Sequence, residues 1–293
     1  MALCWNVNDV FGKSYHVFSG AEVNPHQYPW MVTVIFGDGL CGGALISVRE
    51  GVQKSDAVLT AAHCATKKIC PWEPHNLSSF GVLLGNHAIS KKEELEQARR
   101  AKILVPHPCW GPNRYAFCNE TNYTQLWFSD DIALVFFTEE VHFNSAIAPL
   151  DLPEVNEEPP YGPSSSCHLA GWGDYRSKTN KEEKEVSDVL RTLNVTFMKD
   201  EAPCAKAYGF PLDALTPFLC AQTEKQPASA CQGDSGGPIW CDRPDGKSPR
   251  VHGVVSANSG YCGGDIPGLF TDVAKYMPWI KEQIKKYSKV ANE

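Results

Sequence analysis

The sequence predicts an all-β protein, and two features of its composition carry that prediction. Its 293 residues include 23 glycines and 21 prolines, which favour turns over long helices. Short runs of valine, isoleucine, leucine and phenylalanine recur between those turn residues, as is typical of strands that cross a packed core. With 43% hydrophobic residues, a chain of this length can bury a core as one large domain or as two halves.

The first half of the chain contains six such apolar runs, which are enough to close one barrel. The expected strands span residues 31–36, 41–47, 57–62, 80–84, 103–105 and 132–137. We therefore place a first barrel at about residues 30–148.

A proline-rich stretch at residues 149–166 predicts a linker to a second barrel at about residues 167–274. Trp279, Ile280 and Ile284 recur at helical spacing, so residues 275–288 should form a C-terminal helix with a packing face. Beyond the segment that Cys167 opens, the strands of the second barrel are expected at residues 189–197, 218–220, 239–241, 251–256 and 269–273.

Ser235 is the candidate nucleophile of this chain. It lies in the sequence Cys-Gln-Gly-Asp-Ser-Gly-Gly-Pro, which begins at Cys231. Glycines on both sides leave its hydroxyl on an open, tightly turned backbone that a substrate carbonyl can approach. The alternative for this stretch alone is a glycine-rich turn without function.

His63 and Asp131 supply the two groups that would activate that serine. A hydroxyl needs an imidazole to take its proton, and the imidazole needs a carboxylate to fix its tautomer and stabilise its charge. His63 lies in Thr-Ala-Ala-His-Cys, and Asp131 opens the apolar run Ile-Ala-Leu-Val-Phe-Phe. A carboxylate at the head of such a strand must be paired, whereas its neighbour Asp130 is expected to face solvent.

These three motifs, in the order His, Asp, Ser, resemble the chymotrypsin/trypsin family of serine endopeptidases. The resemblance runs from Val17 to the final helix. It implies two six-stranded antiparallel Greek-key barrels with a C-terminal helix, and a chain that hydrolyses peptide bonds through an acyl-enzyme. It also implies that the amides of Gly233 and Ser235 form the oxyanion hole.

The same resemblance implies that the enzyme is made as a zymogen, with residues 1–16 as a pro-segment and residues 17–293 as the peptidase domain. Cleavage before Val17 would free an amino group that pairs with Asp234. His16 stands where Lys or Arg is usual, and the nearest basic residue, Lys13, would leave three extra residues. The activating protease is therefore left open.

The specificity pocket differs from that of trypsin. Ser229 stands where trypsin-like members carry an aspartate, so the resemblance implies apolar rather than basic residues before the scissile bond. Gly268 leaves one wall open, as in chymotrypsin. The segment Ser256-Ala257-Asn258 replaces the usual Ser-Trp-Gly, and the side chain of Asn258 would narrow the pocket, as in elastase. Asp265 lies nearby.

Twelve cysteines and no Cys-x-x-Cys pair indicate disulfides and an oxidising compartment, with free buried thiols as the alternative. The family resemblance implies four pairs, and Cys109–Cys118 and Cys4–Cys70 are our preferred pairing of the remaining cysteines. The implied pairs are Cys41–Cys64, Cys167–Cys241, Cys204–Cys220 and Cys231–Cys262.

Four glycosylation sequons also favour a secreted, extracellular glycoprotein. Residues 1–16 contain no apolar segment of signal-peptide length, so either the true start is missing or export is not signalled there. Two enlarged loops, 65–79 and 108–129, would border the substrate cleft or serve as glycosylated surface. The sequons are at Asn76, Asn119, Asn122 and Asn194.

Calcium is a candidate ligand of the loop that holds Asn86, Glu93 and Glu96, which resembles the calcium loop of trypsin-like members. An asparagine replaces the expected glutamate, and Lys91 and Lys92 lie inside the loop. A solvated charged hairpin is the favoured alternative, and no cofactor is expected otherwise.

The net charge of −7 is spread along the sequence without a basic patch, which argues against nucleic acid or an anionic membrane as partner. No apolar run is long enough to span a membrane. We expect a monomer whose partners are protein or peptide substrates, with protein protease inhibitors as further candidates. The rival hypothesis is a catalytically silent binding protein on the same fold.

Overall fold

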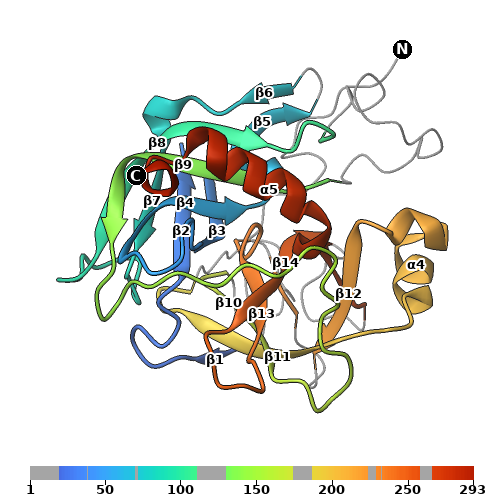
Figure 1. Ribbon diagram of the computed structural model, residues 1–293. Helices are drawn as coiled ribbons and strands as arrows, with labels where there is room; N and C mark the ends of the chain where they lie inside the picture. Colours follow the sequence, from blue (N-terminus) through green and yellow to red (C-terminus); the bar gives the residue numbers. More distant parts are fainter. Residues whose placement is uncertain are drawn as a thin grey trace, which may run out of the picture.

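The computed structural model describes residues 20–37, 39–69, 72–110, 130–173, 187–223, 229–231, 233–257 and 266–293. Two antiparallel barrels lie side by side, with the C-terminal helix α5 (Val273–Tyr287) packed against the first (Figure 1). The two-barrel fold with a C-terminal helix is therefore confirmed. No helix in the described ranges is long and apolar enough to cross a membrane.

The first barrel closes in the order β2-β3-β4-β9-β8-β7. Burial alternates along β7, where Phe80, Val82 and Leu84 point into the core and the residues between them are partly exposed. The strands are β2 (Met31–Phe36), β3 (Gly39–Leu45), β4 (Lys54–Thr60), β7 (Phe80–Leu84), β8 (Gln97–Pro106) and β9 (Ala133–His142).

The second barrel runs β11-β10-β13-β14-β15-β12 and closes through the pairing of β11 with β12. The short strand β1 (Ala21–Glu22) adds to the outside of β11, so the start of the described chain belongs to this half. The barrel strands are β10 (Cys167–Gly171), β11 (Arg191–Phe197), β12 (Phe218–Thr223), β13 (Pro238–Cys241), β14 (Arg250–Ala257) and β15 (Gly268–Asp272).

One continuous apolar core joins the two barrels. It includes Leu45 and Phe136 from the first barrel, Trp240 and Val254 from the second, and Ile280 from α5. The linker is hydrogen-bonded to both halves, because the Leu150 amide donates to the Leu45 carbonyl at 2.8 Å and the Val251 amide donates to the Asp151 carbonyl at 3.0 Å. The seam between the barrels is thus held by apolar packing and by the hydrogen bonds of the linker.

Several short elements lie outside the predicted strands. The β5 (Thr66–Ile69) and β6 (Trp72–Pro74) hairpin follows the short helix α2 (Ala62–Ala65), within the enlarged loop 65–79. Helix α5 starts earlier than expected because the Asp272 side chain caps it by accepting from the Ala274 amide. The other elements are α4 (Ala202–Tyr208), η1 (Leu77–Ser79), η2 (Leu212–Leu215) and η3 (Val290–Asn292).

Candidate active site

Asp131 lies just before β9 and is fully buried, so its carboxylate must be satisfied by partners. Its Oδ1 accepts from the His63 backbone amide at 2.9 Å, and its Oδ2 lies 2.7 Å from His63 Nδ1. The Ser256 hydroxyl donates to the same Oδ2 at 2.7 Å. Three donors from two barrels therefore hold this carboxylate.

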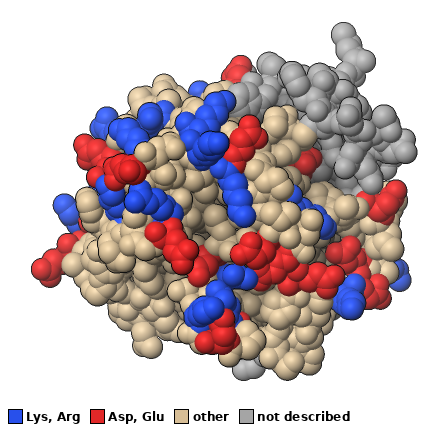
Figure 2. All heavy atoms as spheres, in the orientation of Figure 1, with Lys and Arg blue, Asp and Glu red and all other residues tan. Residues whose placement is uncertain are grey.

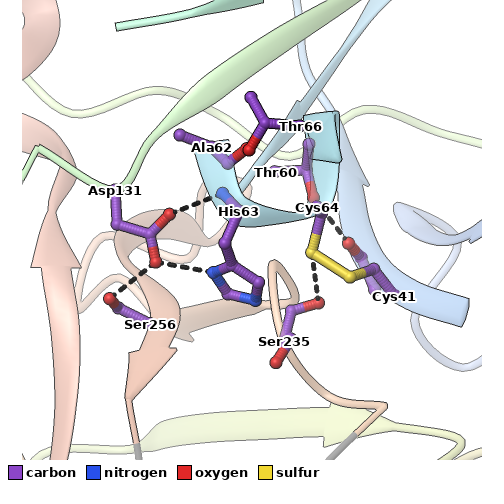
Figure 3. The surroundings of a disulfide bond; sticks show 10 residues. Cys41, Thr60, Ala62, His63, Cys64, Thr66, Asp131, Ser235 and Ser256 are labelled. Carbon is purple, nitrogen blue, oxygen red and sulfur yellow. Dashed lines mark hydrogen bonds and ion pairs between the residues drawn. A yellow bond between two sulfur atoms is a disulfide. The ribbon is translucent and has the colours of Figure 1, made fainter. Parts of the chain in front are cut away.

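His63 is carried by α2, directly after β4, and only 6% of it is exposed. An ionised carboxylate only accepts hydrogen bonds, so Asp131 places the imidazole proton on Nδ1 and leaves Nε2 as the acceptor. In Figure 3 the His63 ring lies between the Asp131 carboxylate and Ser235. The ring is thus oriented to receive a proton on the side of Ser235.

Ser235 is partly exposed, whereas Asp234 and Gly236 on either side of it are buried. Its carbonyl accepts from the Gly42 amide at 2.8 Å, which ties the nucleophile loop to β3 of the other barrel. Gly236 has φ +78°, and a Cβ there would lie 2.7 Å from the Gly42 carbonyl and 3.0 Å from the Ala61 amide. Only glycine permits this close approach.

Asp234 is the second fully buried carboxylate of the region. It accepts from the Cys231 amide at 2.8 Å and from the Gly173 amide at 3.2 Å. A Cβ on Gly171 would lie 2.0 Å from its Oδ1, so that glycine makes room for the carboxylate. Burial raises the pKa of Asp234 well above the ordinary range, and the hydrogen bonds from the two backbone amides offset only part of this rise. Its expected partner Val17 lies outside the described residues.

The pocket residues are partly brought together. Ser229 and Gly268 line one small cavity with Ala221 and Phe270. Ser256 was predicted to contact substrate, but its hydroxyl donates to Asp131. Asn258 and Asp265 lie outside the described residues.

Two residues near the site were missed by the sequence analysis. Tyr208 from α4 donates to the Pro267 carbonyl at 2.9 Å, next to the pocket wall at Gly268. Trp110 is 2% exposed, and its ring centroid lies 6.5 Å from that of His63. Its Nε1 donates to Thr66 Oγ1 at 3.3 Å, and that hydroxyl donates to the Ala62 carbonyl at 3.1 Å. No local motif signals these tertiary contacts.

The expectation for Asp130 was wrong. Its side chain is 15% exposed and accepts from the Tyr276 hydroxyl at 3.0 Å, with His107 Nδ1 at 3.7 Å. The residue has φ +61°, which turns its side chain away from that of Asp131 and toward α5.

The three calcium candidates differ in how far their oxygens are already hydrogen-bonded within the loop. Glu93 Oε1 accepts from the His87 and Ala88 amides at 2.9 and 2.8 Å, and Oε2 lies 3.5 Å from His26 Nε2. Asn86 is buried, with its Nδ2 3.5 Å from Thr33 Oγ1. Glu93 therefore closes the loop through hydrogen bonds, and the Glu96 amide donates to the Glu93 carbonyl. The buried Oδ1 of Asn86 has no hydrogen-bond partner among the described residues, and calcium binding stays a prediction.

Three of the implied disulfides are present in the structure: Cys41–Cys64, Cys167–Cys241 and Cys204–Cys220. The first holds α2, and with it His63, against β3. Cys231 and Cys109 are also disulfide-bonded, but Cys262, Cys118, Cys4 and Cys70 lie outside the described residues.

Comparison with known proteins agrees with this architecture. The trypsin family profile matches residues 17–280. Granzyme A of Bos taurus is 33% identical over 273 residues, which cover 92% of this chain and 88% of that protein. Kallikrein-11 of Mus musculus is 31% identical over 281 residues, which cover 94% of this chain and 84% of that protein.

A solved structure agrees as well. Neuropsin, a serine protease expressed in the limbic system of mouse brain, superposes with a TM-score of 0.68 at 28% identity, covering 92% of this chain and 100% of that chain. The chain therefore belongs to the trypsin family of serine proteases.

Proposed function

We propose that this protein is a secreted serine endopeptidase that hydrolyses peptide bonds through an acyl-enzyme. The observation that carries the proposal is that the Asp131 carboxylate makes two hydrogen bonds with His63, one with its backbone amide at 2.9 Å and one with its ring Nδ1 at 2.7 Å. A buried carboxylate that fixes both the position and the tautomer of an imidazole is the part of a catalytic triad with the strictest geometric demands.

In this mechanism Ser235 Oγ attacks the substrate carbonyl carbon while His63 Nε2 takes the hydroxyl proton. His63 then gives that proton to the leaving amine, and the acyl group stays on Ser235 until water, deprotonated by the same imidazole, releases it. Asp131 stabilises the imidazolium throughout. The amides of Gly233 and Ser235 would hold the oxyanion, and removal of one such donor typically costs about 10²- to 10³-fold in rate.

Activation would depend on Asp234. Its buried carboxylate lacks a cationic partner among the described residues, and burial raises its pKa. The ammonium of Val17, freed by removal of residues 1–16, would pair with it and order the neighbouring Gly233 amide. We expect amino-terminal sequencing of the active form to begin at Val17, and full activity of the uncleaved chain would contradict this step.

The proposed preference is for apolar residues before the scissile bond. Ser229 provides no charge for a basic side chain, and Gly268 leaves the opposite wall free of a side chain. A peptide-library cleavage profile tests this directly. Ser229→Asp should shift the preference toward Lys and Arg by about 10²-fold, since it adds a charge-assisted bond in a buried pocket. A basic preference in the unaltered protein would show that the pocket is assigned wrongly.

Secretion is supported by the disulfides and by the exposure of Asn76 and Asn194, the acceptor residues of two sequons. Granzyme A and kallikrein-11, two relatives of this chain, are the proteins whose route of export this proposal extends to it. Mobility shift after glycosidase treatment of protein from a secreting host tests both the glycosylation and the route of export.

The test of activity is covalent labelling by a serine-directed phosphonate. The processed protein should be labelled, Ser235→Ala should not, and Ser165→Ala, which alters a serine on the linker, should be labelled as the parent is. Absence of labelling after cleavage before Val17 would favour the rival hypothesis of a catalytically silent binding protein.

A further inference from the structure

A groove with a cavity volume of about 760 Å³ lies on a face that shares no residue with the candidate active site. Its walls are α5, the inter-barrel linker, the turn between β13 and β14, and the segment that follows β3. Figure 2 shows lysine and arginine side chains on the face where α5 lies. Six cationic residues line the groove: Arg49, Arg243, Lys247, Arg250, Lys281 and Lys285.

These cations are far apart in the sequence, which is why the charge pattern alone gave no basic patch. The fold gathers them because the linker is fixed between their segments. The Asp151 amide donates to the Pro249 carbonyl at 3.3 Å, and the Val251 amide donates to the Asp151 carbonyl at 3.0 Å. The groove is therefore a pre-formed feature of the seam and not a flexible surface loop.

Acidic residues neutralise one side of the groove. Arg243 and Lys247 pair with Asp245 at 2.8 and 3.3 Å, and Arg250 pairs with Glu157 at 2.7 Å. Three acids also line the groove: Glu50, Asp151 and Glu154. These pairs hold the guanidinium groups of the β13–β14 side in place.

The other side carries more cations than acids, with Glu50 next to Arg49 on the segment that follows β3. Lys281 and Lys285 are exposed and have no acidic partner in the described part of the chain, and Arg49 only donates to the Val290 carbonyl at 3.5 Å. The two lysines are one helical turn apart on α5, so their positions repeat at roughly 6 Å along the helix axis. This wall presents a short row of free cations to an incoming anion.

We propose that this groove binds a sulfated oligosaccharide of the glycosaminoglycan type. Sulfate oxygens accept charge-assisted hydrogen bonds from guanidinium and ammonium groups, and a repeating sulfated chain offers them in a row. No aromatic side chain lines the described walls, so bases of a nucleic acid would find no stacking surface. Met277 and Ile284 on the floor are buried, and the apolar wall residues Val48, Leu152 and Ala291 are only partly exposed, so a protein partner would find no fully exposed apolar anchor.

The test measures binding of a fluorescent heparin octasaccharide by anisotropy over a range of sodium chloride concentrations. Lys281→Gln/Lys285→Gln should weaken binding about tenfold and reduce its dependence on salt. Lys92→Gln/Lys286→Gln removes the same charge from exposed sites outside the groove and should change the affinity less than about twofold. Arg49→Gln, on a different segment, should weaken binding in the same direction as the α5 pair.

Absence of binding at low salt, or an equal loss in both double variants, would overturn the proposal. Oligothymidylate and oligoglutamate of matched charge are the competing probes, and either one binding as tightly as the octasaccharide would also overturn it. Because no arm of this test measures proteolysis, its failure leaves the proposed activity unaffected, and loss of phosphonate labelling leaves the groove unaffected.

Discussion

Asp131 and Asp234 are both fully buried carboxylates near the same serine, yet their surroundings differ. Asp131 contacts an imidazole that can carry positive charge, and it accepts hydrogen bonds from the His63 backbone amide and the Ser256 hydroxyl. Among the described residues, Asp234 accepts only from the amides of Cys231 and Gly173, and burial raises its pKa. The carboxylate of Asp131 therefore has a partner that can carry positive charge, whereas that of Asp234 has only neutral donors among the described residues.

Because their surroundings differ, two buried acids of one protein can respond differently to a change in their partners. A buried charge with complete partners is fixed, and removing it leaves the rest of the network unpaired. A buried acid with a raised pKa responds to any cation that reaches it, which is the property a switch needs.

The largest effect is expected from Asp131→Asn. The amide keeps the shape of the side chain but favours the wrong imidazole tautomer, so kcat should fall by about 10⁴-fold on a peptide substrate. Asp130→Asn is the matched control, because Asp130 bonds to Tyr276 and not to His63. A similar loss in both variants would remove the distinction between the two neighbours.

Asp234→Asn should come next, with a fall in kcat/KM of about 10²- to 10³-fold in the processed protein. An amide cannot hold the Val17 ammonium, so the oxyanion donors would lose their order while the triad stays intact. Phosphonate labelling does not measure kcat/KM, so steady-state kinetics with an ester substrate is the measurement. Unchanged kinetics would show that Asp234 takes no part in activation.

The pH dependence of stability tests the burial of Asp234 without any substrate. Because burial raises the pKa of Asp234, the folded state holds its proton more tightly than the unfolded chain does. The free energy of unfolding should therefore be highest below the ordinary carboxyl range and fall as the pH rises toward the raised pKa.

Thermal unfolding of unprocessed Ser235→Ala between roughly pH 4 and 8 should show this fall, and Asp234→Asn in the same background should flatten it. Parallel curves for the two proteins would contradict the assignment of the slope to Asp234.

The smallest effect is expected from Trp110→Phe, which removes the indole bond to Thr66 and leaves an aromatic ring beside His63. Loss of one hydrogen bond of this kind should lower kcat by about threefold to tenfold with little change in KM. Trp30→Phe is the control, since Trp30 packs on Trp240 in the core and should affect stability alone. Equal effects of Trp110→Phe and Trp30→Phe on kcat would show that the contact of Trp110 with His63 does not position the imidazole.

The sequence predicted elements best where apolar runs end at turns. The bounds of β2 and β7 agree with expectation because those strands are bounded by turn residues at both ends. β8 and β9 each extend to ten residues, since their ladders continue into alternating polar positions that carry no continuous apolar signal. The helix α4 and the strands of the β5–β6 hairpin are too short for a periodic pattern to be detected.

For the site, local motifs pointed to His63, Asp131 and Ser235 because each sits in a distinctive run of neighbours. The contact of Ser256 with Asp131 and the packing of Trp110 against His63 arise only when distant segments meet. The cations of the groove were missed for the same reason, since residues 49, 243–250 and 281–285 share no local pattern.

The apolar cluster that crosses the seam between the barrels has a consequence for folding, even though two further apolar clusters lie within the second half. Since Leu45 and Trp240 belong to one packed cluster, unfolding of either barrel would expose apolar side chains of the other at the seam. A copy in which only the first barrel folded would keep the His63–Asp131 pair but would lack the loop of Ser235, which lies between β12 and β13 of the second barrel. Such a chain would have no nucleophile in place, so the proposed activity requires both barrels to be folded together.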